Sequence, residues 1–278
     1  MMKTIKITQH NIGCTSHVFG DEVIHENYFK GKNYPQVVQK KINTPRSCKN
    51  YFKHNNIFKS DIWTLQEVQE IPASLFIDKL YTIYKWIGTN TGYCIYDNFG
   101  KIVKISHGCA VIWNSNRFNF CKLIPHHLKS ELFRRATPWV LLEDKLTLKR
   151  SVVISLHSRI KYSTRLLYEL NNGVKMFEKY YSIFVGGDFN VINVHKKTKI
   201  LKSTFENEIT NKHTYMNKNK IEYFEGNIDN ILFSKNFKIA QKQIEKHKMF
   251  SLKTLCKFEK ENELINDFDH APISVSLS

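Results

Sequence analysis

A carboxylate and a carboxamide stand two residues apart in the segment Val-Gly-Gly-Asp-Phe-Asn, where the acid is Asp188 and the amide is Asn190. The run before it, residues 180–185, is β-branched and aromatic and predicts a buried strand. The two glycines allow the chain to bend there. Because side chains two positions apart point to the same side of a strand, we expect Asp188 and Asn190 to face one cavity.

Polar side chains also stand at the boundaries of the other apolar runs. The strands predicted from these runs cover residues 3–10, 61–66, 152–157, 228–233 and 271–277. Their boundary residues are Asn11, Glu67, His157, Asp229, Asp269 and His270. If the boundaries converge, they supply the types of group that cleavage of a phosphoester requires.

A divalent cation is the natural counter-charge for such a reaction, because a phosphodiester is anionic and its leaving oxygen gains further charge. Magnesium prefers hard oxygen ligands and keeps several waters, so one or two carboxylates suffice to bind it. We assign Glu67 as the metal ligand, with Asn11 and Asp269 beside it, directly or through water. The expected cofactor is Mg²⁺, or Mn²⁺ in its place.

The remaining polar groups can align water and hold the phosphate. Asp188 can deprotonate a water molecule opposite the leaving group. Asn190 can orient that water or donate to a phosphate oxygen. His157 and His270 can donate to non-bridging oxygens if each is oriented or kept protonated by an acid, and Asp229 suits His270 in that role.

In these segments the chain resembles the endonuclease/exonuclease/phosphatase superfamily, which has the deoxyribonuclease I-like fold. The matching segments follow that family's order over nearly the entire chain: residues 5–11, 61–67, 107–114, 152–157, 183–190, 228–233 and 269–273. The resemblance implies an α/β fold, a four-layer sandwich of two packed mixed β-sheets flanked by helices. It also implies magnesium-dependent phosphoester hydrolysis by the residues assigned above, with Arg134 or Arg135 as a phosphate contact.

Three features depart from the family pattern. Phe268 stands where Ser usually precedes the final Asp-His pair. The connection between Asn11 and Glu67 is long, which predicts an insertion around residues 14–59. The acid that usually pairs with the second histidine, here His157, has no assigned position in this sequence.

The elements between these segments are mostly strands. Antiparallel strands are predicted at residues 81–87, 93–96 and 102–106, and apolar strands at 109–113 and 139–142. Short helices are expected near residues 36–42, 48–58 and 72–80. A longer helix begins at Ser163 or Thr164 and reaches about Lys179, with an apolar stripe at helical spacing that predicts a core face. Many strands and few helices indicate two packed sheets with helices outside.

Composition predicts one domain over residues 1–278, because 42% hydrophobic residues can form one large core and no Pro/Gly/Ser-rich linker divides the chain. No apolar signal region and no stretch long enough to span a bilayer is seen. We therefore expect a soluble, intracellular protein of the cytoplasm or nucleus, and a monomer. The six cysteines have no metal-ligand spacing and are predicted to be buried, reduced thiols.

The formal net charge is +17, from 42 Lys and Arg against 25 Asp and Glu. Such a positive field attracts polyanions, so DNA or RNA is the first candidate partner and an anionic membrane surface is the second. The excess of Lys over Arg also fits the codon bias of an AT-rich genome, which would produce basicity without selection for binding.

Three functions are compatible with these features. The first is a nuclease. In the family that the chain resembles, a histidine at the position of His157 is usual in deoxyribonuclease I-like enzymes, RNA deadenylases and lipid phosphodiesterases. Abasic-site endonucleases usually carry Asn at that position, which disfavours abasic-site repair. The second is a phosphoinositide phosphatase or sphingomyelinase-like lipid phosphoesterase, although the phosphatases have Lys where this chain has Ala271. The third is a non-catalytic nucleic-acid-binding or virion protein, which the complete set of catalytic residue types disfavours.

Overall fold

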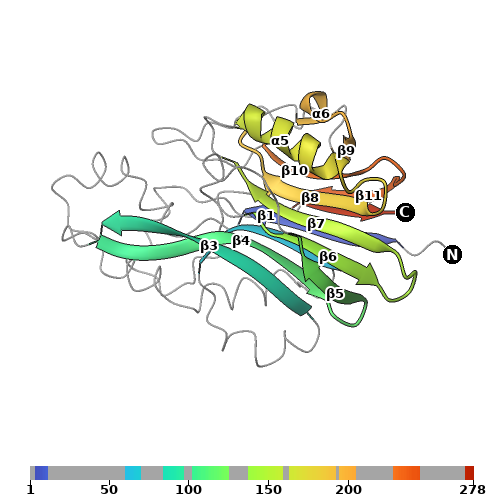
Figure 1. Cartoon of the computed structure of the whole chain (residues 1–278), viewed down its shortest axis with the longest axis horizontal. Coiled ribbons are helices and arrows are strands. Elements are labelled where there is room, and N and C mark those ends of the chain that lie inside the picture. Colours follow the sequence, from blue (N-terminus) through green and yellow to red (C-terminus); the bar gives the residue numbers. More distant parts are fainter. Residues whose placement is uncertain are drawn as a thin grey trace.

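Two β-sheets of six strands each lie face to face in this computed structural model (Figure 1). The structure describes residues 4–11, 60–69, 84–96, 102–124, 137–158, 163–191, 194–204, 228–244 and 273–278. Within these ranges the side chains of residues 67–69, 84–96, 102–108, 195 and 243–244 are not described. The helices predicted at 36–42, 48–58 and 72–80, and the insertion predicted around 14–59, lie outside the described residues.

The first sheet has the strand order β11-β12-β1-β2-β4-β3. Its strands are β1 (Ile5–Asn11), β2 (Ile62–Gln69), β3 (Tyr84–Tyr96), β4 (Ile102–Asn114), β11 (Ile239–Ile244) and β12 (Ile273–Leu277). The central pair, β1 and β2, is parallel, and the other neighbours are antiparallel.

The second sheet has the strand order β5-β6-β7-β8-β10-β9. Its strands are β5 (Phe118–Leu123), β6 (Trp139–Asp144), β7 (Arg150–His157), β8 (Ser182–Asp188), β9 (Leu201–Ser203) and β10 (Asp229–Ser234). Here too the central pair, β7 and β8, is parallel and its neighbours are antiparallel. The predicted sandwich of two mixed sheets is therefore confirmed.

The inner core between the sheets is hydrocarbon over most of its length. Inward residues of β1, β2, β4 and β12 in the first sheet pack against inward residues of β6, β7, β8 and β10 in the second. The largest of these fully buried side chains are Trp113, Phe118, Phe184 and Phe233.

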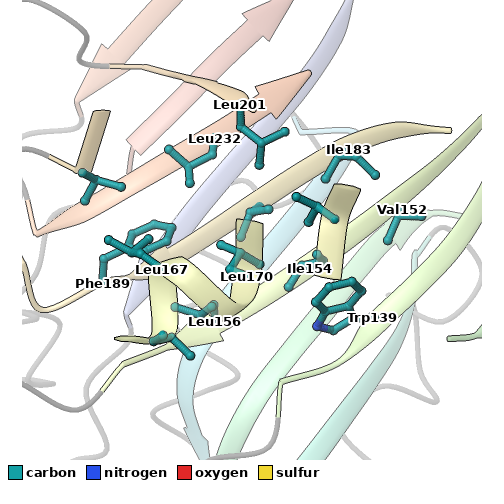
Figure 2. Close-up of a cluster of buried hydrophobic side chains, with 14 of the residues drawn as sticks. Trp139, Val152, Ile154, Leu156, Leu167, Leu170, Ile183, Phe189, Leu201 and Leu232 are labelled. Carbon is teal, nitrogen blue, oxygen red and sulfur yellow. The ribbon is translucent and has the colours of Figure 1, made fainter. Parts of the chain in front are cut away.

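A second apolar cluster covers the outer face of the second sheet. Helix α5 (Ser163–Lys175) packs Leu166, Leu167, Leu170 and Val174 against that face, as its apolar stripe predicted (Figure 2). The short helix α6 (Val194–Lys197) adds Val194 to the same cluster. No helix among the described residues has the length and apolarity needed to cross a membrane.

Strands β3 and β4 are longer than the sequence indicated. The Gly-Thr-Asn-Thr-Gly run at residues 88–92 suggested a break, yet it pairs in continuous register with residues 106–110 of β4. The two strands form the long ribbon at the side of the molecule in Figure 1. Cross-strand hydrogen bonds outweigh the weak strand preference of Gly and Asn here, because strand propensity depends strongly on context.

The two glycines before Asp188 do not bend the chain, contrary to the prediction, since both lie inside β8. They permit close approach instead. A Cβ on Gly186 would meet Thr64 Oγ1 of the facing sheet at 1.9 Å, and a Cβ on Gly187 would meet the Leu156 carbonyl oxygen at 2.3 Å. The lack of a side chain at Gly186 and Gly187 therefore allows β2 and β7 to lie this close to β8.

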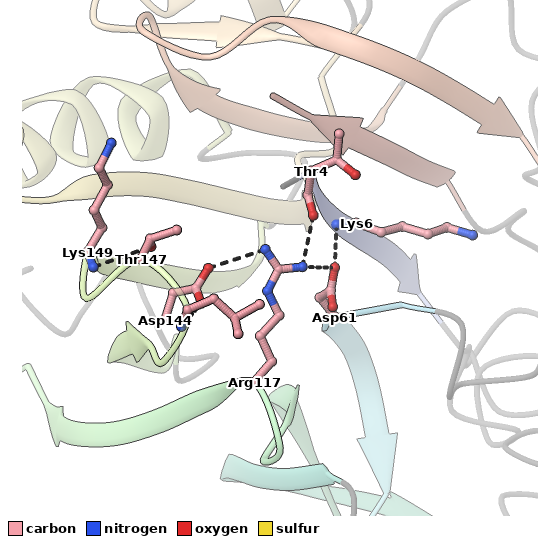
Figure 3. Close-up of polar contacts among 8 residues, drawn as sticks. Thr4, Lys6, Asp61, Arg117, Asp144, Thr147 and Lys149 are labelled. Atoms are coloured by element: carbon pink, nitrogen blue, oxygen red, sulfur yellow. Dashed lines mark hydrogen bonds and ion pairs between the residues drawn. The ribbon is translucent and has the colours of Figure 1, made fainter. Parts of the chain in front are cut away.

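An arginine joins the two sheets at the end where β1 and β2 begin (Figure 3). Arg117, in the turn between β4 and β5, donates to the Thr4 carbonyl at 2.8 Å and to Asp61 Oδ2 at 2.8 Å, both from the first sheet's side. Its other terminal nitrogen lies 3.2 Å from Asp144 Oδ2 at the end of β6. Asp61 also accepts the Lys6 backbone N–H at 2.8 Å, which ties β1 to β2.

The cysteine prediction is only partly right. Cys109 is buried in β4, as expected, but Cys121 is exposed on β5. Burial of part of this side chain and the nearby Glu143 carboxylate raise the pKa of the Cys121 thiol, which therefore favours the protonated, weakly nucleophilic form.

Replacing Gly187 by Ala is expected to lower the free energy of unfolding by about 2–3 kcal/mol, because the new methyl group overlaps a backbone carbonyl that cannot rotate away. Gly173→Ala, inside α5, is the control, and it should be neutral or stabilise by up to about 1 kcal/mol. Urea unfolding of both variants measures the difference. Equal stabilities would show that β7 and β8 are not held at the distance described.

Replacing Arg117 by Ala is expected to cost about 3 kcal/mol, since Asp144, only 3% exposed, loses a charged partner. Arg165→Ala is the matched control, because it breaks the exposed helical pair with Glu169 and should cost about 0.5 kcal/mol or less. A loss for Arg117→Ala no larger than for the control, in thermal or urea unfolding, would mean that this network does not hold the sheets together.

Candidate active site

The interior between the sheets becomes polar towards one end. Along β1 the inward positions change from Ile5 and Ile7 to Gln9 and Asn11, and β2 changes from Ile62 to Thr64 and Gln66. The second sheet shows the same progression. There, Val153 leads to Ser155 and His157 in β7, Phe184 leads to Asp188 in β8, and Phe233 leads to Asp229 in β10.

Three of the predicted site residues form one row across the second sheet. His157 of β7 is in register with Asp188 of β8, and Asp188 is in register with Asp229 of β10. All three side chains are buried, with exposed fractions of 6%, 2% and 1% respectively. The prediction that these strand ends converge is met for this row.

Asn11 joins the row from the facing sheet. Its Nδ2 donates to Asp188 Oδ2 at 3.0 Å, and His157 Nε2 lies 3.5 Å from the same oxygen. The contact joins residues 177 positions apart in the sequence. The carboxylate of Asp188 therefore lies within ion-pair distance of His157, a pairing for which the sequence offered no candidate.

The chain turns immediately after Asp188. Asp188 Oδ1 accepts the Asn190 backbone N–H at 2.9 Å, and Asn190 has a φ of 47°, in the left-handed region that Asn tolerates better than most residues. Asn190 Nδ2 donates to the Ser158 carbonyl at 2.8 Å. The strand ends at Asp188, so the expectation that strand alternation directs Asp188 and Asn190 to the same side does not apply. The Asn190 side chain instead connects the turn after β8 to the residue that follows β7.

Gln9, which the sequence did not single out, connects three strands. Its Nε2 donates to Gln66 Oε1 of β2 at 2.8 Å and to Asp229 Oδ1 of β10 at 2.9 Å. Gln66 in turn donates to Ser155 Oγ at 3.0 Å, and Ser155 Oγ donates to the Leu65 carbonyl at 2.8 Å. Three of these hydrogen bonds cross between the sheets, directly behind the row of site residues.

Glu67 lies in β2 next to this network, at a change of register. From Leu65 to Val68 the chain takes three steps, while the paired residues of β4, Ala110 to Gly108, take two. Such an extra residue re-aims side chains and is common beside active sites. The side chain of Glu67 itself is not described.

The structure tests the predicted metal ligands only in part. Because the Asn11 NH₂ group donates to Asp188, its carbonyl oxygen is directed away from that hydrogen bond and is the kind of hard donor that Mg²⁺ accepts. Among the described side chains there is no group of three His, Cys, Asp or Glu residues that could hold a metal ion. Asp269 lies outside the described residues, as do His270, Arg134 and Arg135.

Two kinds of residue were missed from the sequence. The hydroxyl and carbonyl groups of Ser155 and Ser158 support the site from β7, and a serine near a strand end gives no sequence signal of such a role. Gln9 gave a weak signal, since it follows the apolar Ile5 and Ile7 at the same two-residue spacing as Asn11. Gln9 Oε1 and Thr64 Oγ1 are two of the seven buried side-chain atoms that lack a hydrogen-bond partner within the described residues.

Neither a protein-family model nor a curated protein matches the sequence. Solved structures do match in three dimensions. An endonuclease/exonuclease/phosphatase family protein from Bacteroides thetaiotaomicron superposes with a TM-score of 0.63 at 16% identity, over 99% of this chain and 97% of that one. The chain has the fold of the endonuclease/exonuclease/phosphatase superfamily. The resemblance predicted from the ordered strand-end residues is confirmed at this level.

Two other proteins of this superfamily fold have different partners. D. rerio TDP2, complexed with a single-strand DNA product, has a TM-score of 0.61 at 11% identity, over 99% of both chains. A mannosyl-6-phosphatase from Bacteroides thetaiotaomicron has a TM-score of 0.60 at 17% identity, again over 99% of both chains. The molecules named for these two proteins differ, so the shared fold does not by itself select a substrate.

Replacing Gln9 by Leu is expected to destabilise the protein by about 1–3 kcal/mol, because Asp229 and Gln66 each lose a buried hydrogen-bond donor. Gln241→Leu, on the exposed side of β11, is the matched control and should change stability by less than about 0.5 kcal/mol. Urea unfolding compares the two. A Gln9→Leu protein as stable as the control would mean that the glutamine does not hold β1, β2 and β10 together.

Proposed function

We propose that this protein is a metal-dependent phosphoester hydrolase that cleaves nucleic acid. The observation that supports this most directly is the meeting of Asn11 and Asp188, whose side chains come from facing sheets and lie 3.0 Å apart beside His157 and Asp229. In the sequence, all four residues stand at the boundaries of predicted strands and are of types that phosphoester chemistry uses.

Asp188 is the proposed general base. A carboxylate must be ionised to accept a proton from water. The Asn11 amide and the Asn190 backbone N–H both donate to Asp188, and such donors stabilise the charged form. Because one donor comes from the facing sheet and the other from the turn, the carboxylate is held in one orientation.

Glu67, Asn11 and Asp269 are the proposed ligands of a divalent cation, Mg²⁺ or Mn²⁺. When bound, the cation would neutralise charge on the phosphate and on the leaving oxygen. Asn11 would then both present its carbonyl oxygen to the metal and orient Asp188 through its NH₂ group. This double role links the position of the base to the position of the metal.

The other predicted residues would bind the phosphate. His157, beside the Asp188 carboxylate, is proposed to donate to a non-bridging oxygen, and His270 is proposed to do the same with Asp229 as its acid. Asn190 fixes the turn through Ser158, and its amide retains a second hydrogen for water or phosphate. Arg134 or Arg135 remains a proposed phosphate contact.

Nucleic acid is the proposed substrate because the chain carries a formal charge of +17, and a phosphate backbone is a repeating anion that such a field attracts. The single-strand DNA product in the D. rerio TDP2 complex gives one precedent for this substrate class on this fold.

Asp188→Asn is expected to lower kcat about 100-fold to 10,000-fold, because the amide keeps the shape of the side chain but cannot accept the proton. Glu67→Ala and His270→Ala should also remove most turnover. Glu169→Gln, on α5 and away from the site, is the control for loss of a carboxylate and should retain full activity. Thermal unfolding confirms that each variant folds, and near-normal rates in a folded Asp188→Asn protein would rule out its role as the base.

The substrate class is tested with a panel of plasmid DNA, single-stranded DNA, RNA with a poly(A) tail, sphingomyelin, a phosphoinositide and mannose 6-phosphate, each with Mg²⁺ or with chelator. Cleavage of a nucleic acid that stops with chelator and returns with Mg²⁺ is the expected result. Turnover of a lipid or of the sugar phosphate alone would replace the proposed substrate and keep the chemistry. No turnover of any member would favour a non-catalytic protein.

A further inference from the structure

A basic groove lies at the opposite end of the second sheet from the candidate active site. It has a volume of about 870 Å³ and is bounded by the turn before β7, the turn after α5, the start of β9 and the turn after β10. Ser182, the first residue of β8, and Ser234, the last residue of β10, lie on its wall. The candidate site residues Asp188 and Asp229 are at the other ends of these same two strands.

Positive charge dominates the wall of this groove. Lys149, Arg150, Lys179 and Lys235 line it and are all exposed, while Glu178 is the one acid in the lining. Arg150 is already paired with Glu143 at 2.8 Å. The three lysines form no ion pair with any described residue, so their ammonium groups are available to an external anion.

Aromatic rings lie among these charges. Tyr180 is 76% exposed, and the centroid of its ring lies 6.3 Å from that of the half-buried Tyr181. Tyr181 therefore packs beside the Tyr180 ring. An exposed ring beside lysines is the combination with which proteins hold single-stranded nucleic acid, since the bases stack on the rings and the phosphates pair with the cations. In a duplex the bases are already stacked on one another and cannot use the ring in this way.

The distance to the candidate active site suits a long substrate. Strand β8 has seven residues, so its two ends are separated by roughly 20 Å at about 3.3 Å per residue. A dinucleotide or trinucleotide in the site would not reach the groove. A single strand of 20 or more nucleotides could occupy both.

We propose that this groove is a second binding site for single-stranded nucleic acid, which would retain a long substrate while another part of it is cleaved. The role in retaining a substrate rests on the proposed nuclease function, whereas binding to the groove can be tested without cleavage. A strand is favoured over an anionic membrane because the charges line a concave surface, which a flat bilayer does not enter.

The first experiment measures binding by the full-length protein carrying Asp188→Asn, so that the probe is not cut. Fluorescence anisotropy with a labelled 30-nucleotide single-stranded DNA is recorded over a range of salt concentrations. Adding Lys179→Ala and Lys235→Ala should reduce the slope of log affinity against log salt by roughly 1.4, which corresponds to two phosphate contacts. Lys122→Ala with Lys175→Ala removes two exposed charges elsewhere and should leave the slope nearly unchanged.

Base stacking is tested with two exposed tyrosines, one that lines the groove and one that does not. Tyr180→Ala should weaken binding about fivefold to 100-fold, as expected for the loss of one base stacked on a ring. Tyr168→Ala removes a ring that is 68% exposed on α5 but does not line the groove, and it should have little effect.

Equal effects of the groove and control variants would overturn the proposal. So would a groove variant that loses binding to vesicles of phosphatidylcholine and phosphatidylserine while it binds DNA normally, since the groove would then face a membrane. In protein with an intact active site, the lysine variants should slow cleavage of the 30-nucleotide strand but not of a trinucleotide. If the groove variants alter binding and no nucleic acid is cleaved at all, the groove stands and the proposed nuclease function fails.

Discussion

Apolar side chains fill most of the space between the two sheets, and side-chain hydrogen bonds join the sheets at the end that carries the candidate site. Hydrocarbon side chains need only fill space, whereas each buried polar group that lacks a partner costs about 1–3 kcal/mol. The polar ends of β1, β2, β7, β8 and β10 must therefore find partners across the gap. Gln9 and Asn11 meet this requirement by contacting Asp229 and Asp188, and the same contacts bring the acids together.

The opposite end of the sandwich is held in a different way. There Arg117 joins both sheets through two carboxylates and a backbone carbonyl, at the mouth of the apolar core. Buried atoms without a hydrogen-bond partner occur at both ends among the described residues, Gln9 Oε1 and Thr64 Oγ1 beside the site and Arg117 Nε within this network. Stability supplied by the rest of the sandwich offsets the cost of the site.

Part of this arrangement could be predicted from the sequence, because apolar runs indicate where strands begin and end, and Asn11, His157, Asp188 and Asp229 stand at such boundaries. They lie together because β7 and β8 are parallel, β10 begins where β8 ends, and Asn11 comes from the facing sheet. The contacts of Gln9 could not be predicted, since they depend on how one sheet lies over the other.

The wrong predictions have the same physical origin. Gly186 and Gly187 suggested a bend, but their requirement for space comes from Thr64 in the other sheet and from Leu156 in the neighbouring strand. Residues 88–92 likewise suggested a break in β3, because their partner strand lies beyond the reach of local patterns.

The extra residue in β2 separates the strand into two phases. Up to Leu65, every second side chain belongs to the packed interior, and gaining or losing a residue there would exchange inside for outside along the strand. Beyond the change of register, the backbone of β2 pairs with β4 one residue out of step with the part that contains Ile62 and Thr64. A residue inserted or deleted after this point would therefore leave the pairing of Ile62 to Leu65, and the core that it orders, unchanged.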